Sequence, residues 1–315
     1  MKAQLTARIG PVLREAAARL RSAGIATARQ DAELLLARVL ETTRLALHLE
    51  PTRQLPAEAL AGLEALIARR ASHEPLQYLL GAEDFGGVRL AVGPGVFIPR
   101  PETELLVERA VARCPEAGLV LDLCAGSGAV ACAVAARRTD VTVWAVELAA
   151  EAAGWARANV GRLGLADHIT VLEGDLFAPV AARAERWDLV VANPPYIART
   201  ALASLPAEVR DWEPALALDG GPDGLALIDR ILDGGPAFVR PGGAVLLEIG
   251  HDHADRLRRR LAGDARYGPP LFCRDFLGYE RVLEVTIAGL RPPPSPGGWG
   301  VWGGGGRSQL TCQPG

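Results

Sequence analysis

The chain carries a tetrapeptide, Asn193-Pro194-Pro195-Tyr196, that combines an amide, a backbone corner poor in N–H donors and an aromatic ring. Neither proline has an N–H, and each fixes its own φ, so the carbonyls of this corner stay available as acceptors. Asn193 and the Pro194 carbonyl can accept two N–H bonds, and Tyr196 offers a flat face to a planar group. Amide and exocyclic amine nitrogens need such acceptors because their lone pairs are delocalised. The tetrapeptide therefore predicts methylation of a planar nitrogen, although an isolated Pro-Pro pair can simply end a strand.

A glycine-rich turn lies upstream, where Asp122–Gly128 runs from a predicted strand into a predicted helix. Its glycines let the backbone approach a ligand at the helix N-terminus. Glu147 ends the next predicted strand, where an acidic side chain can accept both ribose hydroxyls of an adenosine. On spacing alone the turn fits two cofactors, because Gly126-x-Gly128-x-x-Ala131 also satisfies the dinucleotide fingerprint.

Polar side chains at successive strand ends separate these two cofactors. Asp122 precedes the glycines, Asp175 follows the third predicted strand, and Asn193 follows the fourth. Acidic and amide groups suit S-adenosylmethionine, which has a cationic sulfonium, an amino group and an adenine N6, whereas a pyrophosphate needs donors. As single residues, Asp122 could cap a helix and Asp175 could form a turn. Together they favour S-adenosylmethionine.

The elements that must position these residues alternate between strand and helix from residue 101 onward. Predicted strands cover Leu119–Leu123, Val141–Val146, Ile169–Leu172, Leu189–Ala192, Ala244–Ile249, Leu271–Arg274 and Val282–Ile287. Strands that alternate with helices predict an α/β fold with a doubly wound, mostly parallel sheet. The last two strands, joined through Gly278, are expected to supply an antiparallel edge.

The spacing of apolar residues divides the chain into further predicted regions. Residues 1–80 show helical spacing and predict a small helical bundle, and residues 81–100 predict a β-hairpin linker around Gly86-Gly87. Residues 101–290 form the predicted catalytic domain. Residues 291–315 are rich in proline and glycine and predict a disordered tail, with docking through Trp299 and Trp302 as the alternative.

Composition bounds the class of protein. The chain has 315 residues, 49% hydrophobic and 23% charged, and a net charge of −3, which gives little support to a nucleic-acid partner. Its five cysteines are odd in number and form neither a CxxC pair nor a Cys/His cluster, which predicts reduced thiols and no metal. The N-terminus lacks an apolar secretory core, and no run approaches 18 uninterrupted apolar residues. We therefore expect a cytoplasmic protein that is not embedded in a membrane.

Several blocks together give the chain a family resemblance from its N-terminus to about residue 290. It resembles the bacterial release-factor glutamine methyltransferases, the protein-(glutamine-N5) methyltransferase family. The blocks that carry the resemblance are Gly81–Phe85, Phe97–Glu104, Asp122–Gly128, Asn193–Tyr196 and Gly220–Gly224. The tetrapeptide alone is also similar to DNA adenine methyltransferases and some RNA methyltransferases. The resemblance implies a seven-stranded class I methyltransferase sheet.

The resemblance also implies an activity and a set of site residues. The substrate would be the glutamine side-chain amide in the Gly-Gly-Gln loop of class I peptide chain release factors, docked on the helical bundle, and S-adenosylmethionine would be the donor. Asn193, Pro194, Pro195 and Tyr196 would hold the glutamine, with Asn193 also beside the donor. The residues implied in cofactor binding are Cys124, Ala125, Gly126, Ser127 and Gly128 for the methionine moiety, Glu147 for the ribose and Leu176 for the adenine. Cys124-Ala125 replaces the more usual Gly-Thr type of pair, and Glu147 stands where Asp is frequent.

Three alternatives stay open: a DNA or RNA base methyltransferase, a dinucleotide-dependent oxidoreductase, and a binding protein that has kept the cofactor pocket. Near the site, Leu205–Leu218 predicts a substrate-gating loop. Arg100 is expected either to contact substrate or to pair with Glu102 or Glu104. His251 and His253 predict a solvated turn, and the arginines from Arg256 to Arg260 a solvated helix face.

Overall fold

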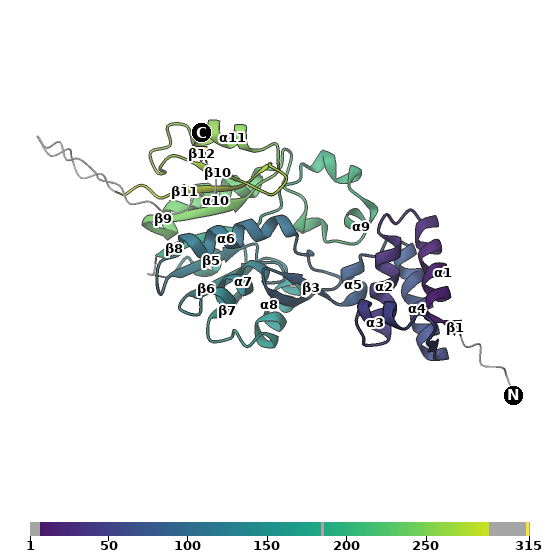
Figure 1. The fold of residues 1–315 in the computed structure, drawn as a ribbon. Coiled ribbons are helices and arrows are strands. Elements are labelled where there is room, and N and C mark those ends of the chain that lie inside the picture. The colour runs from purple at the N-terminus through teal and green to yellow at the C-terminus, as the bar shows by residue number, and fades with distance from the viewer. Residues whose placement is uncertain (1–6, 184–185, 290–312, 315) are drawn as a thin grey trace, which may run out of the picture. The chain divides into compact units, whose positions relative to one another are not determined.

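The computed structural model describes residues 7–183, 186–289 and 313–314, and Figure 1 shows their fold. These residues group into two compact units. The smaller holds the described chain up to Glu83, together with Ala91–Pro94 and Ser204–Glu213, and the larger holds the remainder. Ser204–Glu213 thus clusters with the helical unit although it lies within the predicted catalytic domain. As functional domains, the segments bounded at residues 80, 100 and 290 stay a prediction.

The smaller unit is built on helices whose apolar side chains recur at helical spacing. Its elements are β1 (Ala7–Arg8), α1 (Ile9–Ser22), α2 (Ala28–Val39), α3 (Arg44–Leu49), β2 (Gln54–Leu55), α4 (Ala57–Ala71), α5 (Leu76–Leu80) and, from the later segment, α9 (Ala207–Arg210). Leu20, Leu35 and Leu63 are wholly buried in its core. Arg70, also buried, pairs with Asp31 at 2.8 Å and with Glu208 of α9 at 2.8 Å. Because a buried guanidinium is costly unless it is paired, these contacts fix α9 within this unit.

The larger unit is built on a twisted sheet (Figure 1). Its strands are β5 (Leu119–Leu123), β6 (Thr142–Glu147), β7 (Ile169–Glu173), β8 (Trp187–Ala192), β9 (Val239–Glu248), β10 (Leu271–Arg274) and β11 (Glu280–Thr286). They lie in the order β7-β6-β5-β8-β9-β11-β10, with β11 antiparallel to its neighbours and the other pairs parallel. The predicted seven-stranded, mostly parallel sheet is confirmed. The chain order reverses between β5 and β8, and at such a switch point the carboxyl ends of the strands open a crevice for a ligand.

Helices cover both faces of this sheet. One face packs against α6 (Glu104–Arg113), α7 (Ala129–Arg137) and α8 (Ala150–Arg162), and the other packs against α10 (Ala226–Phe238) and α11 (Ala254–Leu261). Side chains of β5 alternate between the two cores, with Val120 in the first and Leu121 and Leu123 in the second. The described residues also include short 3-10 helices: η1 (Pro101–Thr103), η2 (Ala178–Val180), η3 (Arg199–Ser204) and η4 (Ala215–Ala217).

The predicted hairpin is present as β3 (Ala82–Phe85) and β4 (Val88–Ala91). Its turn is Gly86-Gly87, and both residues have positive φ, which a two-residue hairpin of this kind requires. None of the helices in the described ranges combines the length and the apolar character needed to cross a membrane.

The predicted disorder of residues 291–315 falls almost entirely outside the described residues, and so does the alternative of docking through Trp299 and Trp302. Only Gln313–Pro314 of this segment are described, as a short strand, β12, antiparallel to β10. The disordered tail stays a prediction.

Candidate active site

The strand ends at the switch point bring the predicted site residues to one cavity in the larger unit. Of those residues, the cavity is lined by Cys124, Ala125, Gly126, Ser127, Glu147, Leu176, Asn193, Pro194, Pro195 and Tyr196. Gly128 does not line it. This glycine precedes α7 with φ 76°, and a Cβ there would lie 3.3 Å from the Cβ of Ala156 in α8. Gly128 therefore serves the close approach of two helices.

Glu147 at the end of β6 holds the glycine turn in place. One carboxylate oxygen accepts the N–H of Gly126 at 2.8 Å, and the other accepts the N–H of Ala149 at 2.8 Å. Gly126 has φ 56°, and a Cβ added there would meet no atom within 4 Å. The turn thus leaves open space in front of its backbone, next to a buried carboxylate that has further lone pairs to offer.

Asp122 lies beneath the turn and is 1% exposed. Its Oδ2 accepts the N–H of Ala131 at 3.0 Å, so the side chain supports the start of α7, as a capping residue would. Among the described residues, Oδ1 has no hydrogen-bond partner. Burial raises the pKa of Asp122 to about 8, and the neighbouring negative charge of Glu147 adds to the rise.

The segment after β7 forms another wall of the cavity. Leu176 is buried and adopts φ 47°, which turns its backbone sharply beside Asp175. Asp175 also borders the cavity, and its Oδ2 forms an ion pair with Arg230 at 2.7 Å. Asp175 is therefore a partner of α10 as well as a possible ligand group.

Asn193-Pro194-Pro195-Tyr196 follows β8, which lies between β5 and β9, and all four residues line the cavity. Both prolines are buried, and Asn193 and Tyr196 are half-buried. The Nδ2 of Asn193 donates to the hydroxyl of Thr103 at 3.1 Å. With its nitrogen used in this way, the side-chain oxygen of Asn193 is the atom left to accept an N–H from a ligand.

The block Gly220–Gly224 supports the tetrapeptide from behind. Ile197 donates its N–H to the carbonyl of Leu218, and Gly220 donates to the carbonyl of Ile197. A Cβ at Gly220 would lie 2.8 Å from the carbonyl oxygen of Pro195, so only glycine lets the two backbones approach this closely. This packing gives a physical reason for the second glycine-rich block of the sequence.

Behind the tetrapeptide, Tyr196 contacts a buried acid, Glu248, at the end of β9. The hydroxyl of Tyr196 donates to Oε1 of Glu248 at 3.2 Å. Burial raises the pKa of Glu248 to about 7, while hydrogen bonds from Thr103 and Tyr196 and the positive charge of Arg281 oppose the rise. Sequence reasoning missed both Thr103 and Glu248. An available signal was the acid at the end of the otherwise apolar run Ala244–Leu247.

Three comparisons place the chain among known proteins. Residues 11–81 match the family model described as the PrmC N-terminal domain, and residues 89–207 match the Methyltransferase small domain. The release factor glutamine methyltransferase of Geobacter sulfurreducens is 40% identical over 269 residues, which cover 84% of this chain and 91% of that protein. The protein of the same name from Mycolicibacterium smegmatis is 40% identical over 284 residues, covering 89% and 98%.

The chain belongs to the release factor glutamine methyltransferases. It is therefore a methyltransferase, and its methyl donor is S-adenosylmethionine. The dinucleotide-dependent oxidoreductase is no longer an alternative. Among solved structures, a methyltransferase from Pyrococcus furiosus aligns with a TM-score of 0.49 at 16% identity, covering 64% of this chain and 90% of that one.

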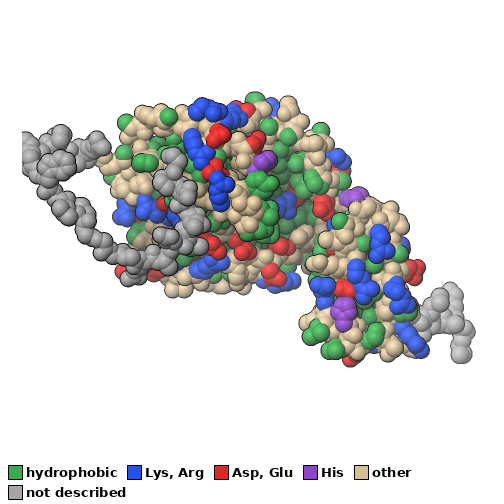
Figure 2. Space-filling model, turned by 45° about the horizontal axis from the view of Figure 1, so that its top comes forward, with side chains coloured by type: hydrophobic (Ala, Val, Ile, Leu, Met, Phe, Trp, Pro, Cys, Tyr) green, Lys and Arg blue, Asp and Glu red, His purple; other side chains and the backbone are tan. Residues whose placement is uncertain are grey.

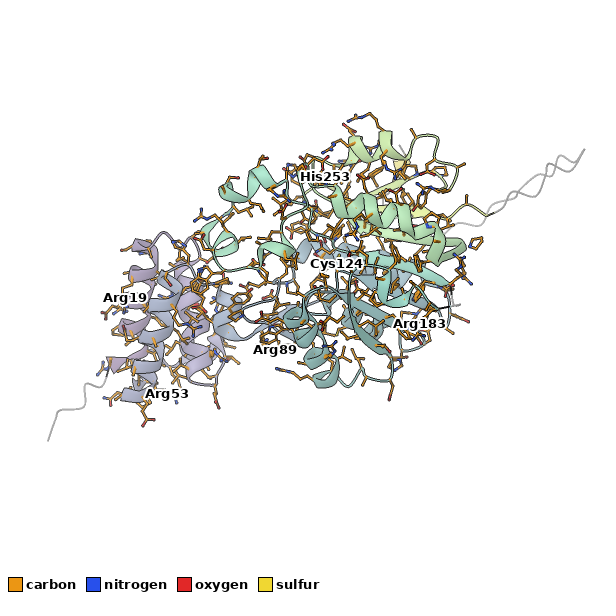
Figure 3. The ribbon with its side chains drawn as sticks, turned by 180° about the vertical axis from the view of Figure 1, so that it is seen from behind. Arg19, Arg53, Arg89, Cys124, Arg183 and His253 are labelled. Carbon is orange, nitrogen blue, oxygen red and sulfur yellow. The ribbon has the colours of Figure 1, made fainter. Side chains whose placement is uncertain are left out.

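The cavity of this methyltransferase fits the donor in chemistry. The donor is a cation with an amino group, and the cavity offers the buried carboxylate of Glu147 and an oxygen of Asp122 that no described residue hydrogen-bonds. The apolar side chain of Leu176 suits a flat purine, and the open space before Gly126 admits a close contact with the backbone. Figure 3 shows Cys124, the first residue of the turn, near the middle of the larger unit.

The structure corrects the prediction of a solvated histidine turn. His251 is exposed, but His253 is 3% exposed, lies edge-on to the Tyr196 ring with 6.4 Å between ring centres, and has its pKa lowered by burial. Figure 3 shows His253 close to α11, the helix that follows it. It therefore packs behind the tetrapeptide of the methyltransferase.

The sequence predictions for Arg100 and for the arginines of α11 can be compared with the structure. The guanidinium of Arg100 lies 4.7 Å from the centre of the Phe97 ring, a contact that was not part of the predicted roles in substrate binding or ion pairing. Three of the four arginines of α11 form ion pairs: Arg256 with Asp223, Arg258 with Glu280 and Arg260 with Asp233. Figure 2 shows basic side chains interspersed with acidic ones on this face of the larger unit, around a gathering of apolar side chains.

The segment Leu205–Leu218 has more regular structure than its sequence indicated. Its first part contains α9 and clusters with the helical unit, and its second part contains η4. Pro214, Leu216 and Leu218 of this second part line the cavity. Leu216 is 55% exposed, which fits a cover over a ligand, and the gating role itself stays a prediction.

Proposed function

We propose that the chain methylates the side-chain amide N5 of the glutamine in the Gly-Gly-Gln loop of class I peptide chain release factors and so tunes translation termination. The observation that carries this proposal is that one cavity is lined both by the acceptor corner Asn193–Tyr196 and by the turn held by Glu147. A carboxamide at that corner would lie in the same cavity as the donor. The family relatives carry the matching name.

In this proposal the chain's own residues orient the substrate. The side-chain oxygen of Asn193 and the carbonyl of Pro194 accept the two N–H bonds of the glutamine amide, and the Tyr196 ring lies against its plane. When bound, S-adenosylmethionine supplies an electrophilic methyl group on a positively charged sulfur. No general base is needed before attack, so positioning dominates, and its effect on the barrier can reach about 7 to 11 kcal/mol. Preorganised acceptors contribute further because the nitrogen becomes positive as its new bond forms.

Around the donor, Glu147 binds the ribose hydroxyls, Leu176 packs on the adenine, and the turn Cys124–Ser127 receives the methionine moiety. Gly128, which does not line the cavity, would shape this turn by allowing α7 and α8 to pack closely. The backbone turns sharply at the start of this segment, because Cys124 adopts φ 56°, a conformation that favours glycine.

The helical unit would dock the release factor, the protein would act in the cytoplasm, and no nucleic acid would be bound directly. The net charge of −3 and the pairing of three of the four α11 arginines with acids support this choice of a protein partner. The alternative, a DNA or RNA base methyltransferase, shares the acceptor corner but would need a basic surface for its target.

The decisive experiment is incubation with methyl-labelled S-adenosylmethionine and a purified class I release factor, followed by mass mapping of the modified peptide. A release factor with the Gly-Gly-Gln glutamine replaced by glutamate serves as the matched control. We expect label on that glutamine and none in the control. Label on added DNA or RNA, with none on the glutamine, would overturn the proposal.

A further inference from the structure

The turn between β10 and β11 carries three exposed apolar side chains. Phe276 is 75% exposed, Leu277 60% and Tyr279 49%, and Gly278 alone interrupts them. Apolar side chains scattered singly on a surface are ordinary, whereas a group of them with polar surroundings is typical of a site that binds another molecule. We call Phe276, Leu277 and Tyr279 the apolar tip. None of the three lines the cavity, so the donor site does not account for them.

Asp275, buried at the base of the turn, fixes the backbone of the apolar tip. Its Oδ1 accepts the N–H of Leu277 and the N–H of Tyr279, both at 3.0 Å. Its Oδ2 forms an ion pair with Arg281 at 3.2 Å, and Arg281 donates in turn to the carbonyl of Ile249 at 3.2 Å. The tip is thus presented on a fixed backbone that is tied to the residue following β9. Binding through side chains held in this way requires little ordering of the backbone.

The apolar tip lies at the same edge of the sheet as the tetrapeptide Asn193–Tyr196. Both β9 and β10 are antiparallel to β11, which lies between them, so their carboxyl ends lie at one edge (Figure 1). Glu248, the last residue of β9, is opposite Val282 in β11 and accepts the hydrogen bond of the Tyr196 hydroxyl at 3.2 Å. Tyr279 comes three residues before Val282. At the usual rise of a strand, this places the tip about 10 Å beyond that pair.

The segment that follows β9 contacts both the apolar tip and the tetrapeptide. The exposed His251 lies edge-on to the ring of Tyr279, with 5.8 Å between ring centres. The buried His253, two residues later, lies edge-on to the ring of Tyr196, with 6.4 Å between ring centres. Neighbouring side chains of the larger unit thus connect the wall of the cavity with the tip.

These dimensions fit a protein partner. A standard protein interface covers about 800 Å² on each side, which is a patch roughly 30 Å across. An interface of that size around the tetrapeptide extends past a tip that lies about 10 Å away. Phe and Tyr are enriched in the cores of such interfaces. A nucleic acid would instead need Lys and Arg for its phosphates, and the tip contains neither.

We propose that the apolar tip is a docking surface for the release factor, which places an apolar patch, next to the loop that carries its glutamine, against Phe276, Leu277 and Tyr279. The inference rests on the proposed function for the identity of this partner. It adds a contact on the larger unit to the docking expected of the helical unit. Because the tip lies outside the cavity, it contributes affinity for the release factor and leaves the methyl transfer itself unchanged.

The test replaces the exposed side chains of the tip and uses a purified class I release factor. In the double variant Phe276→Ser with Leu277→Ser we expect KM for the release factor, and the Kd of the complex measured without donor, to rise by about tenfold or more, the scale of losing interface anchors. The kcat and the Kd for S-adenosylmethionine should stay within about twofold of the original. The Tm should stay unchanged because both side chains are exposed. The matched control, Phe276→Leu with Leu277→Met, keeps the tip apolar and should bind the factor within about threefold of the original.

Each other result counts against the docking surface or against the proposed function. Equal KM and Kd for the serine variant and the original protein would overturn the docking surface, and so would a control variant that binds as weakly as the serine variant. Sedimentation that finds the original chain dimeric and the serine variant monomeric, with equal binding of the release factor, would assign the tip to contact between two copies. If the serine variant loses affinity for the factor but the original chain methylates no glutamine, the docking surface stands and the proposed function fails.

Discussion

A Cβ added at Gly224 would lie 2.4 Å from the backbone carbonyl oxygen of Tyr196 and 2.8 Å from Nε2 of His253. Real Cβ atoms do not approach backbone oxygen so closely, and the φ of Gly224 is 82°, which side-chain-bearing residues rarely adopt. The glycine is thus a fixed part of the wall behind the tetrapeptide. The block Gly220–Gly224 therefore contributes to the site by packing against the tetrapeptide, although it has no reactive side chain.

Gly224→Ala should therefore displace Tyr196. We expect thermal stability to fall by several degrees and kcat to fall about tenfold or more, since small misplacements of an orienting group are costly. The matched control is Gly154→Ala in α8, where an added Cβ meets nothing within 4 Å. Alanine favours a helix over glycine, so the control should be as stable as the original or slightly more so. Equal behaviour of the two variants would contradict the packing argument.

Asn193→Ala tests the acceptor corner itself. The substitution removes the oxygen proposed to hold the substrate N–H, while the turn held by Glu147 is untouched. We expect kcat to fall by about 100-fold or more and the Kd for S-adenosylmethionine to change little, the pattern for losing one preorganised polar group. Calorimetry and single-turnover methylation measure the two effects separately. Methylation at the normal rate by this variant would discredit the role of Asn193.

Glu147→Gln tests the donor side. Its carboxylate holds Gly126 and Ala149 and is proposed to bind the ribose, so removing its charge weakens several hydrogen bonds at once. We expect the Kd for S-adenosylmethionine to rise by about tenfold or more, in line with the worth of a hydrogen bond to a charged group. Glu173→Gln at the exposed end of β7 is the control and should bind normally. Equal affinities for the two variants would contradict the role of Glu147.

The alternation of strand and helix was enough to predict the architecture. The predicted bounds of Leu119–Leu123 and Leu271–Arg274 agree with β5 and β10. Period-two and helical patterns were clear there because each element buries one face or both. The strand-end residues could be found for the same reason, since parallel strands bring their carboxyl ends to one edge.

The sequence did not reveal contacts that depend on tertiary packing. Thr103 and Asn193 are 90 positions apart, and Tyr196 and Glu248 are 52 apart, so no local pattern links them. His253 was expected in solvent because it lies in a polar stretch, but the tetrapeptide covers it. Ser204–Glu213 was assigned to the catalytic domain because of its place in the chain, whereas the buried Arg70 attracts Glu208 into the helical unit.

The pH dependence of stability should report on Asp122. Burial raises its pKa from 3.8 to about 8, so the folded state binds the proton more tightly than the unfolded state. The resulting stabilisation is complete below the ordinary pKa of 3.8 and is lost as the pH rises through about 8. Asp122→Asn keeps an acceptor for Ala131 and cannot ionise, so it avoids this loss. We expect the Tm of the variant, relative to the original, to rise by several degrees between about pH 6 and about pH 9.

The control for this measurement is Asp140→Asn. Hydrogen bonds from Arg138 hold the pKa of Asp140 below its usual range, so Asp140 is ionised throughout the interval from about pH 6 to about pH 9. The Tm difference between Asp140→Asn and the original protein should therefore stay flat across that interval, whatever its size. Scanning calorimetry of the three proteins in matched buffers gives both differences. A flat difference for Asp122→Asn as well would contradict a pKa of Asp122 near 8 in the folded protein.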